Sequence, residues 1–181
     1  EVKANLGYFK HVFWNGAYTG EPLYDDAGSS ITSYVLSGGN FFISVAELKD
    51  TSFTWFPIDS IVTLTDEFDQ ISPKRTFVSQ IDSTYNLRTG DEQGIYLEVE
   101  GFENDNDPNF RSLYRLQSPE DMFDEWVGTP NVCGVYQFQY PLTAGKAVLL
   151  SLPVHNGYDP LLDGNNNFID FLDYLLTVEF R

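Results

Sequence analysis

An acidic loop holds the densest group of candidate metal ligands in this sequence. Glu103, Asp105 and Asp107 occupy alternate positions in the run FENDNDPNF, and two asparagines stand between them. Calcium takes roughly six to eight oxygen ligands, which carboxylates and amide carbonyls supply. The spacing departs from the EF-hand pattern, because no glycine follows and no glutamate closes the loop. The run predicts a calcium site, with a solvated acidic turn as the alternative.

A second group of oxygen donors lies in the run DGNNNFIDFLD. Asp163 and Asn165 alternate as the first ligands of an EF-hand loop do, but Phe168 stands where that loop requires glycine. Asp163 and Asn165 are therefore candidate calcium ligands, and an Asx-rich turn is the alternative. Calcium is the only cofactor that the sequence suggests.

Three glutamates form the run Glu98-Val-Glu100-Gly-Phe-Glu103. The run resembles the Glu-x-Asp-x-x-Glu signature of the laminarinase-like retaining glycosidases, which are jelly rolls. The resemblance implies that Glu98 is the nucleophile, Glu103 the acid/base and Glu100 a tuning residue, with the reacting pair about 5–5.5 Å apart. It covers six residues of 181, and Glu100 replaces the aspartate of the signature. A small glycosidase is therefore the weakest of the alternatives.

The sequence offers few residues for nucleophilic catalysis or for a zinc site. Its single cysteine, Cys133, lies in the apolar run VCGVY, and its two histidines are His11 and His155. A zinc site normally takes about four ligands, largely His and Cys, from a compact motif. No Gly-x-Ser-x-Gly elbow and no phosphate-binding glycine pattern occurs. We predict a buried structural thiol at Cys133, a structural role for His11, and no catalytic residues.

The elements that must position these residues read as short strands rich in aromatic and β-branched residues. Gly38-Gly39 would form the turn of a hairpin, and Ser118-Pro119 would begin one short helix. The predicted class is all-β, a two-sheet jelly roll or β-sandwich of about 8–10 strands that uses residues 1–181 as a single domain. The segments with strand character, which would supply roughly eight core strands and some additions, cover residues 6–14, 31–37, 40–48, 52–56, 60–65, 76–81, 94–100, 111–116, 134–140, 146–154 and 172–180.

Charge and composition limit the classes of partner. The 27 acidic and 10 basic residues give a formal net charge of -17, which opposes binding to nucleic acid and to anionic lipid. No apolar run is long enough to insert into a membrane. The 15 Phe and 11 Tyr exceed the needs of one core, so aromatic residues are expected at a subunit interface or at a sugar-binding platform.

Across its whole length the chain resembles the single jelly-roll capsid proteins of icosahedral viruses with an internal membrane, including those that infect salt-loving archaea. The shared features are the strand-rich length of 181 residues, the acidic composition, the lone cysteine, the aromatic strand at 134–140 and the final strand at 172–180. The resemblance implies a structural assembly protein of the virion that self-associates and contacts other shell proteins. The alternative is a secreted carbohydrate-binding β-sandwich module, extracellular or on a cell surface.

Overall fold

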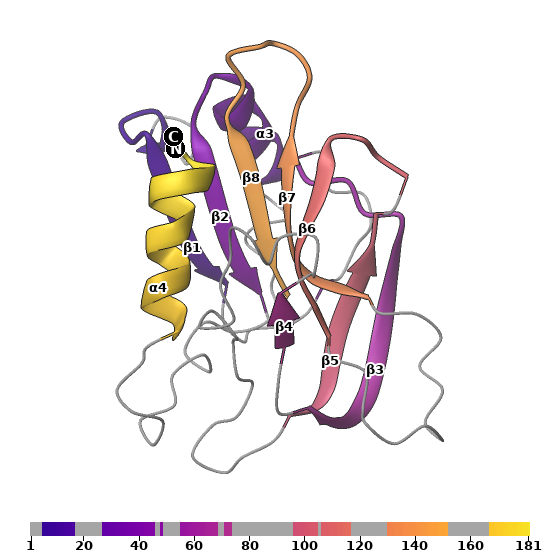
Figure 1. The fold of residues 1–181 in the computed structure, drawn as a ribbon. Coiled ribbons are helices and arrows are strands. Elements are labelled where there is room, and N and C mark those ends of the chain that lie inside the picture. Colours follow the sequence, from indigo (N-terminus) through magenta and orange to yellow (C-terminus); the bar gives the residue numbers. More distant parts are fainter. Residues whose placement is uncertain are drawn as a thin grey trace.

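One mixed β-sheet organises the part of the chain that the structure describes. The structure, a computed structural model, describes residues 5–16, 27–45, 48, 55–68, 71–73, 96–104, 106–116, 130–151 and 167–181. The sheet has eight strands, and its main path runs β1-β2-β8-β7-β5-β3 (Figure 1). Off this path, β4 pairs with β6, and β6 pairs with β7. The strands are β1 (His11–Gly16), β2 (Asn40–Val45), β3 (Ser60–Phe68), β4 (Ile71–Pro73), β5 (Tyr96–Glu103), β6 (Phe110–Leu116), β7 (Asn131–Gln137) and β8 (Lys146–Leu150).

The sheet is parallel at one end and antiparallel at the other. β1 pairs in parallel with β2, and β2 in parallel with β8, whereas β8–β7, β7–β6 and β3–β5 are antiparallel. Parallel neighbours require a crossover, which between β1 and β2 contains the helix α3 (Gly28–Leu36). The parallel half is consequently covered by helices, as parallel sheets usually are.

Helices lie on opposite faces of the parallel half. α3 lies behind the sheet in Figure 1, and the C-terminal helix α4 (Asn167–Tyr174) lies in front of it. α4 continues into one π-helical segment, η4 (Leu175–Glu179). We call the two faces of the sheet the α3 face and the α4 face.

The main hydrophobic core lies on the α3 face. It joins Ile31 and Val35 of α3 to alternate residues of β2 and β8, among them Phe41, Ile43 and Leu149. The α4 face has a smaller aromatic contact, in which the Phe171 ring packs edge-on against Phe42 and Tyr114. Since successive strand residues point to opposite faces, each central strand serves both layers.

The strand-rich class predicted from the sequence is confirmed, but the described strands do not form a two-sheet jelly roll. They belong to one sheet, and its parallel pairs are foreign to the antiparallel jelly roll. The expected strands at 60–65, 94–100, 111–116 and 146–154 correspond to β3, β5, β6 and β8. The expected helix after Ser118-Pro119 and the expected strand at 76–81 lie outside the described residues.

The expected strand at 31–37 is wrong, because this segment lies in α3. Its β-branched residues favour a strand, but Ile31, Tyr34 and Val35 are buried with the spacing of a helix face. Gly38, with a φ of 97°, terminates the helix, and the N–H of Gly39 returns to the carbonyl of Tyr34. The glycine pair thus ends a helix and leads into β2, where a hairpin turn was expected.

The expected strand at 172–180 is also wrong, since this segment belongs to α4 and η4. A strand would place Tyr174, Leu176 and Val178 on one face, but Tyr174 is buried whereas Leu176 and Val178 are exposed. Burial recurs instead at the helical spacing of Phe171, Leu175 and Glu179, with Tyr174 and Phe180 also buried. In the described residues, no helix has both the length and the apolar character needed to cross a bilayer.

Candidate functional site

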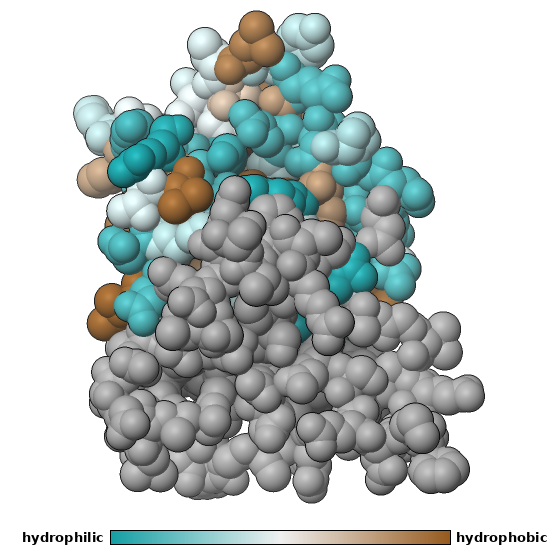
Figure 2. Space-filling model, in the orientation of Figure 1, coloured by the Kyte–Doolittle hydropathy of each residue, from teal (hydrophilic) through white to brown (hydrophobic). Residues whose placement is uncertain are grey.

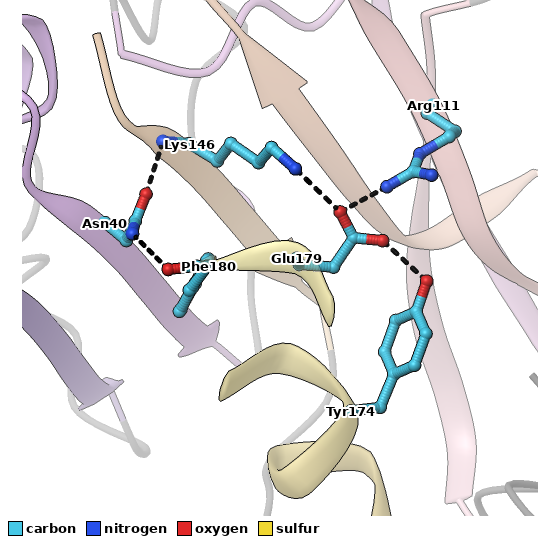
Figure 3. A network of polar contacts seen from close by, with 6 residues as sticks. All are labelled: Asn40, Arg111, Lys146, Tyr174, Glu179 and Phe180. Atoms are coloured by element: carbon cyan, nitrogen blue, oxygen red, sulfur yellow. Dashed lines mark hydrogen bonds and ion pairs between the residues drawn. The ribbon is translucent and has the colours of Figure 1, made fainter. Parts of the chain in front are cut away.

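A buried carboxylate lies at the centre of the polar contacts on the α4 face. Glu179, the last residue of η4, has only 1% of its surface exposed. Its Oε2 accepts from the Arg111 guanidinium of β6 and, at 3.3 Å, from the Lys146 Nζ of β8. Its Oε1 accepts from the Tyr174 hydroxyl at 2.5 Å (Figure 3). Three separate elements therefore meet at one side chain.

The contacts of Glu179 explain how this carboxylate tolerates burial. Burial of a charged group without partners costs roughly several kcal/mol. Here two cations and a hydroxyl replace the hydration that the Glu179 carboxylate loses. Burial, together with the hydrogen bond to Glu179 and its charge, raises the pKa of Tyr174 well above its ordinary value. The Tyr174 hydroxyl therefore stays protonated at neutral pH and serves as a donor.

Asn40 makes a second polar junction beside the first. Its Oδ1 accepts from the backbone N–H of Lys146 at 2.8 Å, and its Nδ2 donates to the Phe180 carbonyl at 3.2 Å. These two contacts fix which end of the amide is the donor. Nδ2, which lies 3.2 Å from His11 Nδ1, must therefore donate to that ring nitrogen, so the imidazole is neutral with its proton on Nε2. The junction ties β1, β2, β8 and the C-terminal segment together.

A groove of about 690 Å³ opens on the α4 face next to the Glu179 cluster. Gln137 and Val135 of β7 line it, whereas Tyr136 between them belongs to the core on the α3 face. Arg111 and Lys146 link the groove to Glu179, because both also line it. We call it the β6–β8 groove. Its lining comprises Pro108, Asn109, Phe110, Arg111, Val135, Gln137, Phe138, Gln139, Tyr140, Leu142 and Lys146.

The groove combines several kinds of binding surface. Asn109, Gln137 and Gln139 carry amides that can both donate and accept hydrogen bonds. Tyr140 is 78% exposed in the connection between β7 and β8. Hydrophilic residues spread over the upper part of this face, and a hydrophobic group stands at the top, over that connection (Figure 2). Such a mixture suits a ligand with both hydroxyl groups and apolar C–H faces.

The predicted calcium ligands are held separately where the structure describes them. The Glu103 carboxylate accepts from the Ser60 hydroxyl at 3.0 Å. The Asp107 carboxylate accepts from the Asn109 N–H at 2.9 Å and contacts the Tyr136 hydroxyl. In the described ranges, no three His, Cys, Asp or Glu residues form a group that could hold a metal. Asp105, Asp163 and Asn165 lie outside the described residues, so the calcium site stays a prediction.

The glycosidase-like run lies in β5 without the bend that such a site would need. The β3–β5 ladder is continuous from Ser60↔Glu103 to Thr65↔Glu98, so no bulge intervenes. Glu100 and Glu103, three positions apart, face opposite sides of the sheet. The Glu100 carboxylate instead accepts from the backbone N–H of Leu48. The side chain of Glu98, the implied nucleophile, lies outside what the structure describes, so the glycosidase motif stays a prediction.

The predicted structural roles of Cys133 and His11 are confirmed. Cys133 is fully buried, and burial, with the nearby charge of Glu179, raises the pKa of its thiol. His11 stacks on Phe180, with 5.6 Å between ring centroids and 8° between planes. Trp55 is buried, which fits a core residue and not a sugar platform. His155 and Trp126 lie outside the described residues.

No sequence motif identifies the residues that meet at the groove. Arg111 and Lys146 are 35 positions apart by number, and only the β6–β7–β8 order brings them together. Glu179 falls within the segment 172–180, which was expected to be a strand but forms part of a helical segment. A usable signal was the scarcity of basic residues, since only ten occur in 181.

Comparison with known proteins supports the fold. No protein family model and no curated protein matches the chain, whereas several solved structures do. One of these is the mmIFT52 N-terminal domain, with a TM-score of 0.56 and 14% sequence identity. The match covers 97% of this chain and 80% of that chain. At this identity the likeness shows a shared fold alone.

Proposed function

We propose that this chain is a binding module that recognises a saccharide in the β6–β8 groove. The observation that carries the proposal is the composition of the lining, in which amide side chains stand beside an exposed aromatic ring and two cations. The volume of about 690 Å³ lies within the range of ligand sites in proteins. The described residues of the lining include no carboxylate, imidazole or thiol, which favours recognition over acid/base chemistry.

Each part of the lining has a use in sugar recognition. Sugar hydroxyls donate and accept hydrogen bonds, and the amides of Gln137 and Gln139 offer both partners. The Tyr140 ring, which is largely exposed, can stack on the C–H face of a pyranose while its hydroxyl stays in water. Phe138 of the same connection packs against Tyr136, with 5.0 Å between ring centroids, and so anchors that connection to the core.

The test is a screen of the whole chain against an array of oligosaccharides, followed by calorimetry on the glycans that bind. We expect Tyr140→Ala and Gln137→Ala each to weaken binding about tenfold, the equivalent of about 1.4 kcal/mol. Tyr8→Ala is the matched control, since Tyr8 is an equally exposed tyrosine outside the groove. Absence of binding to every glycan class would reject the proposal, as would equal losses in all three variants.

A second candidate function, assembly through a further copy of the chain, is favoured by a separate surface. Phe13 at the edge of the sheet and Ile169, Leu176 and Val178 of the C-terminal helical segment are exposed apolar residues. We call these four residues the apolar edge surface. Among the described strands, β1 pairs with β2 alone and lies at the edge of the sheet. We propose that a second copy of β1, with the same apolar flank, pairs with this edge.

Assembly has its own measurement, which is light scattering after gel filtration across a series of salt concentrations. The charge of -17 opposes self-association, so salt that screens this charge should increase the size of the particles. The double variant Leu176→Asn, Val178→Asn should stay monomeric, and Leu142→Asn on the groove side is the control. A wild-type monomer at every salt concentration would reject this candidate.

A viral-shell subunit is one form of the assembly proposal and depends on the same measurement. It predicts closed multimers of defined size, together with contacts to other shell proteins in the virion. Because the described strands form one mixed sheet, this form no longer draws support from a two-sheet jelly roll. The apolar edge surface is the observation that supports assembly.

A further inference from the structure

The β6–β8 groove gathers positive charge on a protein that is otherwise strongly acidic. The chain carries 27 acidic and 10 basic residues, so most of its surface repels anions. Arg111 and Lys146 nevertheless both line the groove, because β6 and β8 lie on either side of β7. A pair of cations at one site is therefore a local reversal of the charge of the molecule.

The arrangement of the Glu179 cluster directs its cations toward the groove and hides its anion. The Glu179 side chain is 1% exposed, whereas those of Arg111 and Lys146 keep 35% and 24% exposure. Both cations contact the same oxygen of Glu179, Oε2 (Figure 3). A ligand in the groove can therefore reach the two partly exposed cations, whereas the carboxylate of Glu179 is buried.

The other described carboxylate near the groove is directed away from it. Asp107 precedes the lining residue Pro108, but its carboxylate contacts the Tyr136 hydroxyl and the Asn109 backbone N–H. Tyr136 belongs to the core of the α3 face, whereas its neighbours Val135 and Gln137 line the groove. The Asp107 carboxylate is therefore engaged by these two donors at the rim of the groove.

We infer that the saccharide bound in the groove is acidic and that Arg111 and Lys146 hold its carboxylate. This inference rests on the proposed function and names the ligand class. A guanidinium offers a planar fork that matches a carboxylate, and an ammonium adds a compact charge beside it. The amides of Gln137 and Gln139 remain for the hydroxyl groups of the sugar. A uronic acid residue combines these two kinds of group on one ring.

Glu179 and Tyr174 act as positioning residues for this site. A flexible lysine or arginine loses side-chain entropy when it is fixed on a ligand, which weakens binding. Glu179 already holds both cations, and Tyr174 orients the carboxylate by donating to its other oxygen, Oε1. The cations are thus ordered before the ligand arrives.

The experiment compares two matched ligands by calorimetry on the whole chain at neutral pH and constant ionic strength. One ligand is a galacturonic acid trisaccharide and the other is the galactose trisaccharide of the same linkage. We expect the acidic ligand to bind about tenfold more tightly, which is the usual effect of a hydrogen-bonded charge. Lys146→Met should abolish most of this preference, and Lys146→Arg should retain it. Lys10→Met removes an exposed lysine outside the groove and should leave the preference unchanged.

A second measurement does not depend on any variant. In the wild-type chain the preference for the acidic trisaccharide should decline as salt is raised, because screening weakens the contact of its carboxylate with partly exposed cations. Equal binding of the two trisaccharides at every salt concentration would overturn the inference and leave the proposed function standing. Failure of both trisaccharides and of all other glycans to bind would overturn the proposed function together with the inference.

Discussion

The two faces of the sheet are built from the same strands, yet they differ in almost every property. On the α3 face, Phe41, Ile43 and Leu149 enter a core in which the helix α3 completes the packing. On the α4 face, Asn40 and Lys146 of the same two strands, β2 and β8, take part in polar junctions. The α4 helix covers only part of this second face, and the β6–β8 groove opens beside it. The main hydrophobic core thus lies on one side of the strands, and the side for which we propose recognition is the other.

The largest expected effect comes from breaking the α3 face. Phe41 is fully buried, and its ring packs edge-on against Trp55 with 5.4 Å between centroids. Phe41→Ala should lower the free energy of unfolding by about 3–5 kcal/mol, because it leaves a cavity in a close-packed core. Urea denaturation measures this change. A loss below about 1 kcal/mol, as small as that of a typical exposed substitution, would contradict the assignment of the core to this face.

A smaller loss is expected from disturbing the polar junction on the α4 face. Arg111→Met removes one of the two cations beside the buried Glu179 but keeps the apolar stem of the side chain. We expect a loss of about 1–3 kcal/mol, since Lys146 continues to compensate the carboxylate. Urea denaturation again provides the measurement, with Arg111→Lys as the charge-conserving control. An increase in stability in Arg111→Met would show that Glu179 does not depend on this partner.

The third effect is a dependence of stability on pH that resides in His11. Burial, and to a lesser extent the charge of Lys10, lower the pKa of His11 from its ordinary value of 6.5. The unfolded chain therefore binds the proton more readily than the folded chain. The contribution of the neutral His11 ring to the free energy of unfolding is fully present above pH 6.5. It is lost as the pH falls from 6.5 toward the lower pKa of the folded state.

Thermal unfolding across this range, compared between the wild type and His11→Gln, tests the histidine assignment. The wild type should lose stability on acidification relative to the variant, which has no group titrating at that position. Parallel pH profiles in the two proteins would contradict a neutral His11 held by Asn40.

The smallest effects on stability are expected in the groove itself. Gln137→Ala and Tyr140→Ala change exposed side chains and should alter the free energy of unfolding by no more than about 0.5 kcal/mol. The same variants are expected to weaken saccharide binding, so at this site binding should change while the free energy of unfolding does not. Large destabilisation in either variant would mean that the groove residues serve the fold.

The sequence predicted most described strands correctly but failed where local pattern and tertiary packing disagree. β3, β5, β6 and β8 contain alternating or apolar runs of the expected kind. The segment 31–37 contains several β-branched residues and the segment 172–180 alternates, yet each forms a helix, because burial at helical spacing on a shared sheet outweighed β-propensity. Because of these two errors, a hairpin was predicted where the structure has a βαβ crossover. A two-sheet sandwich was predicted where the structure has one sheet between helices.

The candidate site could not be predicted because its parts share no sequence motif. Lys146, Arg111 and Glu179 come from β8, β6 and η4, and their meeting depends on the strand order and on the helical C-terminal segment. By contrast, the buried Cys133 was predictable from a short apolar run. The pattern of apolar residues within one element is enough to predict burial. A site made by several elements can be predicted only when their arrangement in space is known.

The most direct test of the central claim is an NMR titration of the isotopically labelled whole chain with the galacturonic acid trisaccharide. If the α4 face is the recognition surface, shifts will concentrate at Asn109, Arg111, Gln137, Tyr140 and Lys146, while the core residues of the α3 face stay unchanged. Shifts spread over both faces, or confined to residues far from the groove, would contradict the division of labour between the two faces of the sheet.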